Sequence, residues 1–304
     1  MLHEEITKDI LGAAAVADVN CRVVQYALGT VIIPHTASFQ PLQVFSSANF
    51  LGTALTLSQY TYYTDAGLGA LNNTISSFRL KRGYMATFAQ NANGTGVSKT
   101  YVAQDSDLDV SVLRSNLDDL VSFVRVFPWR WTGKKGWSGA VENLVDPKWS
   151  YDWDNSTTST RDTEYVPMRH NLNWNAYANI NNKQNSTHTL GFNEPDKADQ
   201  ANMTVATAIA NWPNLLASGL RLGSPAPSDA GSGLTWLYDF ISQADALNYR
   251  VDYVAVHFYK CGWNASQYYN WLLGIYQTTG RPIWITEFNN GANSSPAARS
   301  ILLA

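Results

Sequence analysis

Four apolar segments recur at a nearly constant interval in the second half of the chain. They begin at residues 189, 221, 251 and 282, so that successive starts lie 32, 30 and 31 residues apart. Strands and helices that alternate at about 30 residues are typical of parallel βαβ units. Helical patterns fill the gaps at 203–218, 233–248 and 265–277. Three earlier strand patterns, GWSGAV, KWSYDW and EYVPMRH, bring the sequence close to a (β/α)8 barrel of the TIM type.

The eighth unit of such a barrel has no counterpart in the sequence. Residues 289–304 read NNGANSSPAARSILLA and contain no strand pattern. The second half is therefore expected to be an α/β barrel that is truncated before its eighth unit. Such a barrel leaves two sheet edges unpaired, which favours aggregation or pairing with a partner.

Tryptophan usage divides the chain into two parts. All 11 tryptophans fall at or after Trp129, which is hard to reconcile with one uniform domain. Residues 43–126 alternate in short strands and repeat weakly at about 40 residues, as a duplicated antiparallel β motif does. We therefore expect a multidomain chain, with an all-β domain at 41–127 and the barrel at 134–304. Residues 1–40 match neither domain.

Composition excludes two classes of partner. The net charge is -3 and only 15% of residues are charged, with no basic patch, which argues against nucleic acid. Polar residues interrupt every apolar run well before the ~18 residues that span a membrane, so no membrane partner is expected. An Asn- and Thr-rich, weakly charged chain suits an extracellular, secreted protein, although the acidic start HEEITKD does not resemble a signal peptide.

Two carboxylates stand at the ends of expected strands. Glu194 lies at the end of HTLGFNEPD, and Glu287 lies at the end of PIWITEF, three strand units later. Reactive groups of a parallel barrel lie at such C-terminal ends. A single glutamate there is more often a solvated residue or a helix cap. Two at matching ends form the pair that cleaves a glycosidic bond, one as proton donor and one as nucleophile.

Side chains near the two glutamates are expected to bind the sugar. The Asn193 amide suits a sugar 2-hydroxyl, and His257 ends a neighbouring strand, where a structural histidine is the more common case. Trp149, Tyr151 and Trp153 share one face of a strand, where core packing and sugar stacking both remain open. The predicted substrate-binding residues are Asn193, His257, Tyr259, Trp149, Tyr151, Trp153 and Trp284.

The second half carries a family resemblance. The runs LGFNEPD, RLGSPAPS, VDYVAVHFY and RPIWITEF resemble glycoside hydrolase family 128 over residues 134 to 292. The resemblance implies a (β/α)8 retaining glycosidase that cleaves β-1,3-glucan internally and needs no cofactor for catalysis. It further implies that Glu194 is the acid/base and Glu287 the nucleophile.

The first half resembles a βγ-crystallin domain, a sandwich of two Greek-key motifs. The VFSSANFLG hairpin and the duplicated polar ends carry the likeness. It implies calcium binding by Asn/Asp-Asn/Asp-x-x-Ser/Thr-Ser, and oxygen donors suit calcium. NNTISS fits fully, DDLVSF has Phe123 in place of the last serine, and ordinary polar turns remain the alternative. The predicted calcium ligands are Asn72, Asn73, Ser76, Asp118, Asp119 and Ser122.

Two functional hypotheses follow from these features. The leading one is a retaining endo-β-1,3-glucanase whose partner is a β-glucan polysaccharide. The alternative, motivated by the missing eighth strand, is a non-catalytic protein that binds calcium and glycan through a degenerate barrel. A purely structural crystallin-like protein would need neither the Asn193–Glu194 pair nor the Thr286–Glu287 pair.

Overall fold

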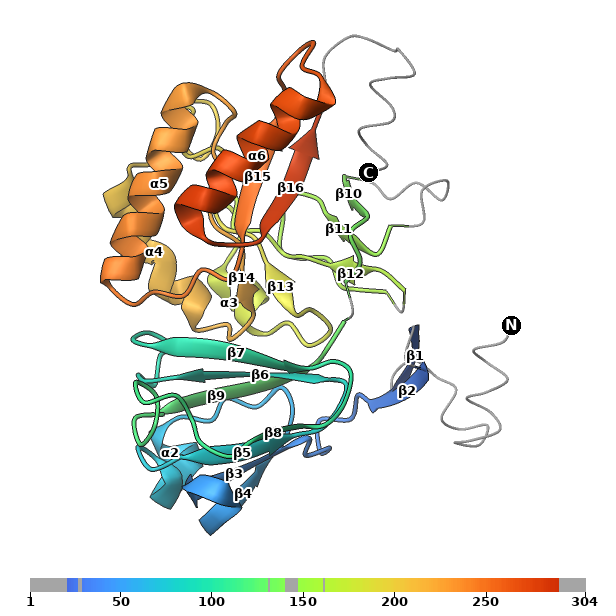
Figure 1. The fold of residues 1–304 in the computed structure, drawn as a ribbon, viewed down its shortest axis with the longest axis vertical. Helices are drawn as coiled ribbons and strands as arrows, with labels where there is room; N and C mark the ends of the chain where they lie inside the picture. The colour runs from blue at the N-terminus through green and yellow to red at the C-terminus, as the bar shows by residue number, and fades with distance from the viewer. Residues whose placement is uncertain (1–20, 27–28, 131, 140–146, 161, 290–304) are drawn as a thin grey trace.

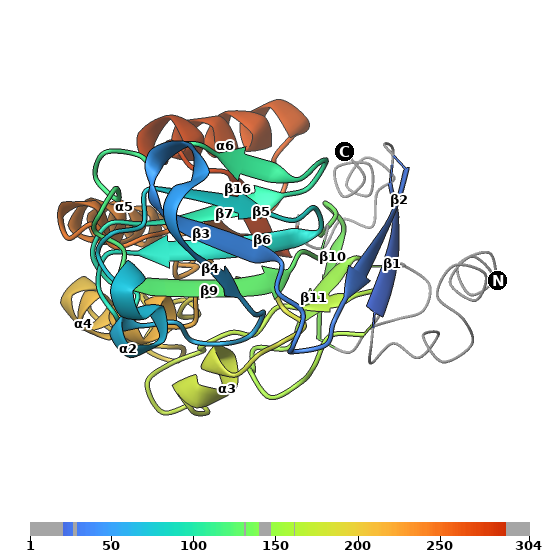
Figure 2. The ribbon, with the colours of Figure 1, turned by 90° about the horizontal axis from the view of Figure 1, so that it is seen from below.

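The protein is described here by a computed structural model. It describes residues 21–26, 29–130, 132–139, 147–160 and 162–289. Two bodies lie one above the other in Figure 1, a β-sandwich and a mixed α/β part. A hairpin of β1 (Cys21–Tyr26) and β2 (Gly29–Pro34) stands to one side of the sandwich in Figures 1 and 2.

The sandwich consists of two antiparallel sheets. One has the strand order β4-β3-β5-β8 and the other β7-β6-β9. The strands are β3 (Leu42–Ser47), β4 (Leu51–Leu57), β5 (Ser77–Leu80), β6 (Tyr84–Ala89), β7 (Ser98–Ala103), β8 (Leu108–Val110) and β9 (Phe123–Pro128). Short helical turns η2 (Ala48–Phe50), α2 (Asp65–Leu68) and η3 (Gly69–Leu71) connect them.

The two sheets differ in how much of their surface is covered. Phe78 of β5 stacks on Phe88 of β6, with ring centroids 4.8 Å apart, inside the sandwich core. Every residue of β6 and β9 is buried, whereas β4 is mostly exposed. Strands buried throughout must be covered on both faces. One face of the β7-β6-β9 sheet meets the other sheet, and its outer face meets the α/β part (Figure 1).

The α/β part contains the expected parallel strands in chain order. Short strands pair in parallel as β10-β11-β12, β13-β14 and β15-β16, and isolated parallel bridges Met168–Leu190 and Gly223–Tyr253 join these groups. The strands are β10 (Gly136–Ser138), β11 (Trp149–Tyr151), β12 (Glu164–Tyr165), β13 (His188–Thr189), β14 (Arg221–Leu222), β15 (Val254–Phe258) and β16 (Ile283–Phe288). The region where we expected the barrel to lack its eighth unit falls after Asn289, outside the described residues.

The three predicted helices are confirmed. They are α4 (Val205–Leu216), α5 (Gly231–Ala246) and α6 (Ala265–Thr279), and a short α3 (Tyr177–Asn181) precedes them. The Thr204 hydroxyl caps α4 by accepting from the Thr207 amide at 3.1 Å, and Asn264 with Gln267 forms a capping box at α6. These side chains satisfy donors that a helix start leaves unpaired.

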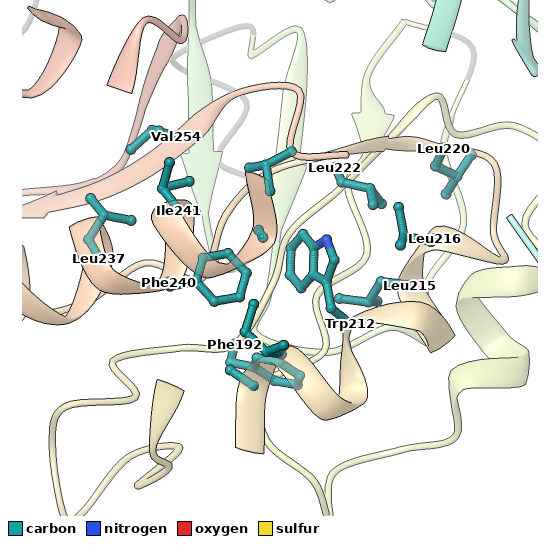
Figure 3. Packing of buried hydrophobic residues seen from close by; sticks show 14 of the residues in the cluster. Phe192, Trp212, Leu215, Leu216, Leu220, Leu222, Leu237, Phe240, Ile241 and Val254 are labelled. Atoms are coloured by element: carbon teal, nitrogen blue, oxygen red, sulfur yellow. The ribbon is translucent and has the colours of Figure 1, made fainter. Parts of the chain in front are cut away.

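The largest hydrophobic cluster lies between these helices and the strands (Figure 3). The Trp212 ring of α4 meets the Phe240 ring of α5 edge to face, with centroids 5.0 Å apart. The indole nitrogen of Trp212 donates to the Arg250 carbonyl at 3.0 Å, so its polar atom is satisfied inside the core. Met85 and Phe127 of the sandwich belong to the same cluster. The two parts therefore share a core.

A buried arginine joins the two parts. Arg125 of β9 is 2% exposed, and its guanidinium donates to the carbonyls of Asn181, Ser218 and Tyr60 at 2.8, 2.5 and 3.2 Å. Asn181 ends α3 and Ser218 follows α4, where helix carbonyls lack intrahelical partners. A cation is also favoured at a helix C-terminus. Nearby, the Thr87 hydroxyl of β6 donates to the Gly219 carbonyl at 2.7 Å.

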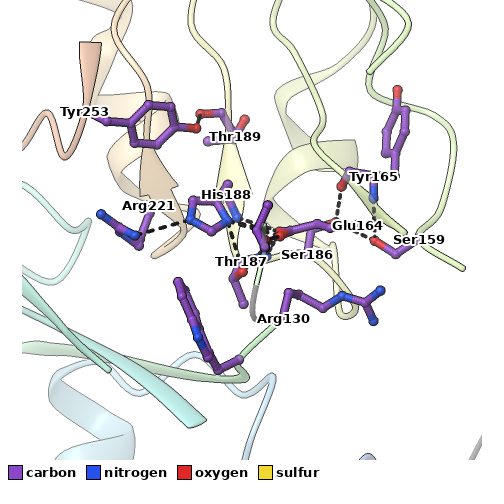
Figure 4. A network of polar contacts seen from close by, with 12 residues as sticks. Arg130, Ser159, Glu164, Tyr165, Ser186, Thr187, His188, Thr189, Arg221 and Tyr253 are labelled. Carbon is purple, nitrogen blue, oxygen red and sulfur yellow. Dashed lines mark hydrogen bonds and ion pairs between the residues drawn. The ribbon is translucent and has the colours of Figure 1, made fainter. Parts of the chain in front are cut away.

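A second polar network lies where the chain passes from the sandwich into the α/β part (Figure 4). The buried Glu164 carboxylate accepts from Nδ1 of His188 at 3.1 Å and from the Thr187 amide at 2.5 Å. Burial alone would raise the pKa of Glu164. The charge and hydrogen bond of His188, the charge of Arg130 and a hydrogen bond from Thr132 outweigh it, and that pKa falls to about 2. Trp129 packs on the His188 ring, with centroids 5.3 Å apart, which ties the connecting segment to this network.

Candidate active site

The two predicted glutamates meet at one histidine. Asn193, beside Glu194, bridges to Ala226 after β14, and His257 of β15 is the register partner of Glu287 on β16. Nδ1 of His257 lies 3.0 Å from Glu194 Oε1, and its Nε2 lies 3.4 Å from Glu287 Oε1. One oxygen of each carboxylate and one ring nitrogen all lie within 4.8 Å of one another. Carboxylates of retaining glycosidases are ~5–5.5 Å apart, against ~6.5–9.5 Å in inverting enzymes.

Three donors hold the Glu287 carboxylate. The Trp153 indole nitrogen lies 2.7 Å from Oε1 and the Tyr259 hydroxyl 2.5 Å from Oε2. The Tyr151 hydroxyl, 3.2 Å from Oε1, shares its one proton with the Thr286 carbonyl at 2.9 Å. Burial, followed by the hydrogen bond and charge of Glu287, raises the pKa of Tyr259. Burial and then Glu287 raise the pKa of Tyr151 as well. Both phenols therefore stay protonated near neutral pH and point donors at a fixed anion.

Glu194 occupies an unusual backbone conformation. Its φ is 38°, in the left-handed region that glutamate rarely adopts. Its amide donates to the Ala226 carbonyl at 2.8 Å, and Asp196 accepts from the amide and hydroxyl of Ser228 at 2.8 and 2.5 Å. These bonds fix the turn that follows β13 against the segment after β14. Strained backbone held in this way is found most often at functional sites.

Asn193 has one amide atom engaged and one available. Its Nδ2 donates to Gln200 Oε1 at 3.1 Å, whereas its buried Oδ1 has no hydrogen-bond partner. A buried acceptor without a donor costs free energy, which a hydroxyl group from a ligand would recover. The predicted contact between Asn193 and a sugar hydroxyl stays a prediction.

The predicted aromatic residues divide into two groups. Trp149 is 5% exposed and packs on Trp284, with centroids 4.8 Å apart, inside a cluster that also contains Tyr253. Other rings cover Trp149, which argues against sugar stacking by this residue, whereas Trp284 is only partly buried and its contact with substrate stays a prediction. Core packing, the default for this row, holds for Trp149. Trp153 and Tyr259 reach Glu287, and Tyr259 is 46% exposed.

The sequence reasoning missed His170. Its carbonyl accepts from the Asn193 amide at 3.0 Å. Burial lowers the pKa of the His170 ring, while a hydrogen bond with Gln200 and the charge of Glu287 oppose that shift. His170 closes the strand pattern EYVPMRH, so the strand-end rule applied to Glu194 would also have found it.

The predicted calcium residues contain two oxygen atoms that lack partners. Asn72 and Asp118 open the two six-residue motifs, and Oδ1 of each is buried with no hydrogen-bond partner. The residues that follow, Asn73 and Asp119, both adopt left-handed conformations, with φ of 57° and 56°. The two motifs therefore have matching geometry and each presents a free oxygen, the kind of ligand that calcium requires.

Serine hydroxyls link the two motifs crosswise. The Ser122 hydroxyl donates to Oδ1 of Asn73 at 2.8 Å, and the Ser76 hydroxyl donates to Oδ1 of Asp119 at 3.0 Å. Each candidate calcium site thus contains side chains from both repeats, and their oxygen atoms are ligands that fit a calcium ion. The Glu194, His257 and Glu287 atoms also lie close enough to share a metal, but the hydrogen bonds to Glu287 already account for their arrangement.

Comparison with known proteins places this geometry in a family. Residues 130–301, more than half of the chain, match the family described as glycosyl hydrolase catalytic core. The chain belongs to this family. No curated protein matches it. In the part of the chain that the structure describes, no helix is long and apolar enough to cross a membrane.

Solved structures refine the assignment. An endo-β-1,3-glucanase of family GH128, subgroup I, from Amycolatopsis mediterranei shares 35% identity over 54% of this chain and 75% of its own, with a TM-score of 0.47. A curdlan-specific exo-β-1,3-glucanase of GH128 subgroup III from Blastomyces gilchristii shares 31% over 57% of this chain and 82% of its own, with a TM-score of 0.47. The second half is thus a GH128-type glycoside hydrolase domain.

The first half has relatives of its own. A βγ-crystallin domain from Flavobacterium johnsoniae shares 32% identity over 29% of this chain and 94% of its own, with a TM-score of 0.26. The N-terminal domain of protein S shares 33% over 29% and 94%, with a TM-score of 0.25. Both resemblances noted in the sequence, to GH128 and to the βγ-crystallins, are confirmed by these identities.

Proposed function

We propose that this GH128 chain is a retaining endo-β-1,3-glucanase in which Glu194 is the acid/base and Glu287 the nucleophile. The observation that carries the proposal is the approach of the two carboxylates to within 4.8 Å, on either side of His257. The solved GH128 enzymes that this chain resembles act on β-1,3-glucan, one as an endo- and one as an exo-enzyme.

The first step forms a bond between Glu287 and the sugar. A carboxylate oxygen of Glu287 attacks the anomeric carbon while the bond to the leaving oxygen breaks, and Glu194 gives its proton to that oxygen. The donors from Trp153, Tyr151 and Tyr259 fix the direction of attack because they hold both oxygens of Glu287. His257 positions the two carboxylates relative to each other.

The second step returns the enzyme to its starting state. Glu194, now ionised, removes a proton from water, and the resulting hydroxide attacks the anomeric carbon from the face that the leaving group occupied. The bond to Glu287 breaks and its electrons return to the carboxylate. Two inversions at one carbon give net retention of configuration.

Single-residue variants test the two roles. Glu194→Gln and Glu287→Gln should each abolish the release of reducing ends from soluble β-1,3-glucan while the far-UV circular dichroism spectrum stays unchanged. Asp239→Asn is the matched control, because Asp239 is an exposed carboxylate on α5 that accepts a hydrogen bond from Gln243 of the same helix. Normal activity in both glutamine variants would refute the assignment.

Azide distinguishes the nucleophile from the acid/base. In Glu287→Gly a small anion can enter the space of the lost carboxylate and attack from its face, so the product is a glycosyl azide of inverted configuration. In Glu194→Ala an aryl β-glucoside, whose phenolate leaves without being protonated, still forms the covalent intermediate, and azide attack gives retained configuration. The reverse pattern would exchange the two roles.

Several expectations from the sequence stay part of this proposal. The parallel order from β10 to β16 supports a (β/α)8 frame, with a crystallin-like domain at 41–127 and the catalytic domain at 134–304. Calcium in the crystallin-like domain is supported by the free oxygens of Asn72 and Asp118. An extracellular location stays a prediction. The non-catalytic alternative is not favoured, because both glutamates and the donors around Glu287 are in place.

A further inference from the structure

An exposed tryptophan stands in the loop beside the two glutamates. Trp174 is 48% exposed, in the segment between Met168 and α3. Met168 and Asn193 bridge in parallel to their neighbours, so this loop follows the same strand ends as the catalytic candidates. Leu172, two residues earlier, is also exposed. A single exposed apolar side chain is common on protein surfaces, so the surroundings of Trp174 decide whether it has a function.

The loop that carries Trp174 is held in one conformation. The Arg169 guanidinium donates to the carbonyls of Trp174 and Leu172, each at 2.5 Å, and it lies 4.2 Å from the centre of the Tyr177 ring. The Asn173 amide donates to Oδ1 of Asn171 at 2.8 Å. These bonds restrict the loop backbone before any ligand arrives, so that binding costs less conformational entropy.

His170 connects Trp174 to the reaction centre. The rings of His170 and Trp174 pack together, with centroids 5.3 Å apart and planes tilted by 34°. The His170 carbonyl accepts a hydrogen bond from the Asn193 amide, and the charge of Glu287 acts to raise the pKa of the His170 ring. Nδ1 of His170 is buried and has no hydrogen-bond partner. An apolar ring face therefore stands next to a vacant polar atom, on the side of the site that borders Asn193.

We propose that Trp174 and His170 form a sugar-binding position for a glucosyl unit beyond those joined by the cleaved bond. The apolar face of the pyranose stacks on the indole, and a hydroxyl of the same unit bonds to Nδ1 of His170. This inference rests on the proposed β-glucanase function and adds a residue that sets chain-length preference. Trp149 cannot take this role, because it is buried in the strand cluster.

The test compares Trp174→Ala with the wild type on laminaribiose and laminarihexaose, which are β-1,3-linked. We expect the KM for laminarihexaose to rise about tenfold while kcat stays within about twofold, because the contact is lost equally from the bound substrate and the transition state. Trp174→Phe should recover most of the loss. Tyr269→Ala is the matched control, since Tyr269 is a more exposed aromatic residue, on the helix α6.

Binding of the same probes by calorimetry separates this inference from the proposed activity. Weaker laminarihexaose binding in Trp174→Ala, with laminaribiose binding unchanged, upholds the sugar position even if the wild type cleaves nothing. Hexaose affinity equal to that of the wild type, in a variant with an unchanged melting temperature, overturns it. A tenfold fall in kcat with constant KM would also overturn it, because Trp174 would then act on the chemical step.

Discussion

Arg125→Met should destabilise the catalytic half from a position in the crystallin-like half. Methionine keeps the apolar stem but removes the donors to the carbonyls of Ser218, Tyr60 and Asn181. The Asn181 carbonyl keeps a second donor, the Tyr62 hydroxyl at 2.9 Å. The buried Ser218 carbonyl, left without its donor, costs about 1–2 kcal/mol, and with the lost charged hydrogen bonds the total is about 2–4 kcal/mol. This corresponds to a lower melting temperature by roughly 6–12 °C.

Tryptophan fluorescence in a urea titration is the appropriate assay. All 11 tryptophans lie at or after Trp129, so fluorescence reports on the catalytic half, while the substitution lies before it. The fluorescence midpoint should fall together with the far-UV circular dichroism midpoint. Arg79→Met is the control, because Arg79 is an exposed residue of the other sheet that pairs with Asp109 at 3.5 Å, and its loss should cost less than about 1 kcal/mol. A fluorescence midpoint equal to that of the wild type would refute the coupling.

Three further predictions follow from individual contacts. Tyr259→Phe removes the donor to Glu287 Oε2 and should lower kcat roughly tenfold to a hundredfold in steady-state hydrolysis of β-1,3-glucan, with KM nearly constant; an unchanged kcat would contradict it. Glu164→Gln should cost about 3 kcal/mol at pH 7, because the folded-state pKa lies at about 2 instead of 4.5. The ionised carboxylate stabilises the fold above pH 4.5 and loses that effect as the pH falls toward 2. The free energy of unfolding, measured by denaturation, should therefore differ less between variant and wild type at pH 3 than at pH 7. Calcium at about 100 times its Kd should add about 2.7 kcal/mol of stability per site, and the double variant Asn72→Ala, Asp118→Ala should lose this gain in a thermal melt; an equal gain would exclude these ligands.

Sequence periodicity predicted the elements that matter for the site. The constant interval of about 30 residues located β13, β14, β15 and β16 with the helices between them, because each unit must cross the sheet and return. Residues at the ends of parallel strands meet at one edge of the sheet. The meeting of Glu194, His257 and Glu287 could therefore be expected from their positions alone.

The aromatic residues could not be assigned in the same way. Alternation predicts that Trp149, Tyr151 and Trp153 share one strand face, but it does not say what covers that face. In the structure β11 ends at Tyr151, before Trp153 with its φ of 58°. The structure packs Trp149 against Trp284 and turns Tyr151 and Trp153 toward Glu287. Trp174 lies outside any regular element, so periodicity gave no reason to consider it.

Local chemistry and long-range packing thus determine different features of this protein. The sequence by itself determined the order of strands and helices, the two carboxylates at strand ends and the repeated calcium-type motifs, because each depends on neighbours along the chain. Only the tertiary structure decided which rings face the site, and that Arg125 reaches the ends of α3 and α4. Those outcomes depend on contacts between residues as far apart as Arg125 and Ser218, 93 positions along the chain, which no local pattern encodes.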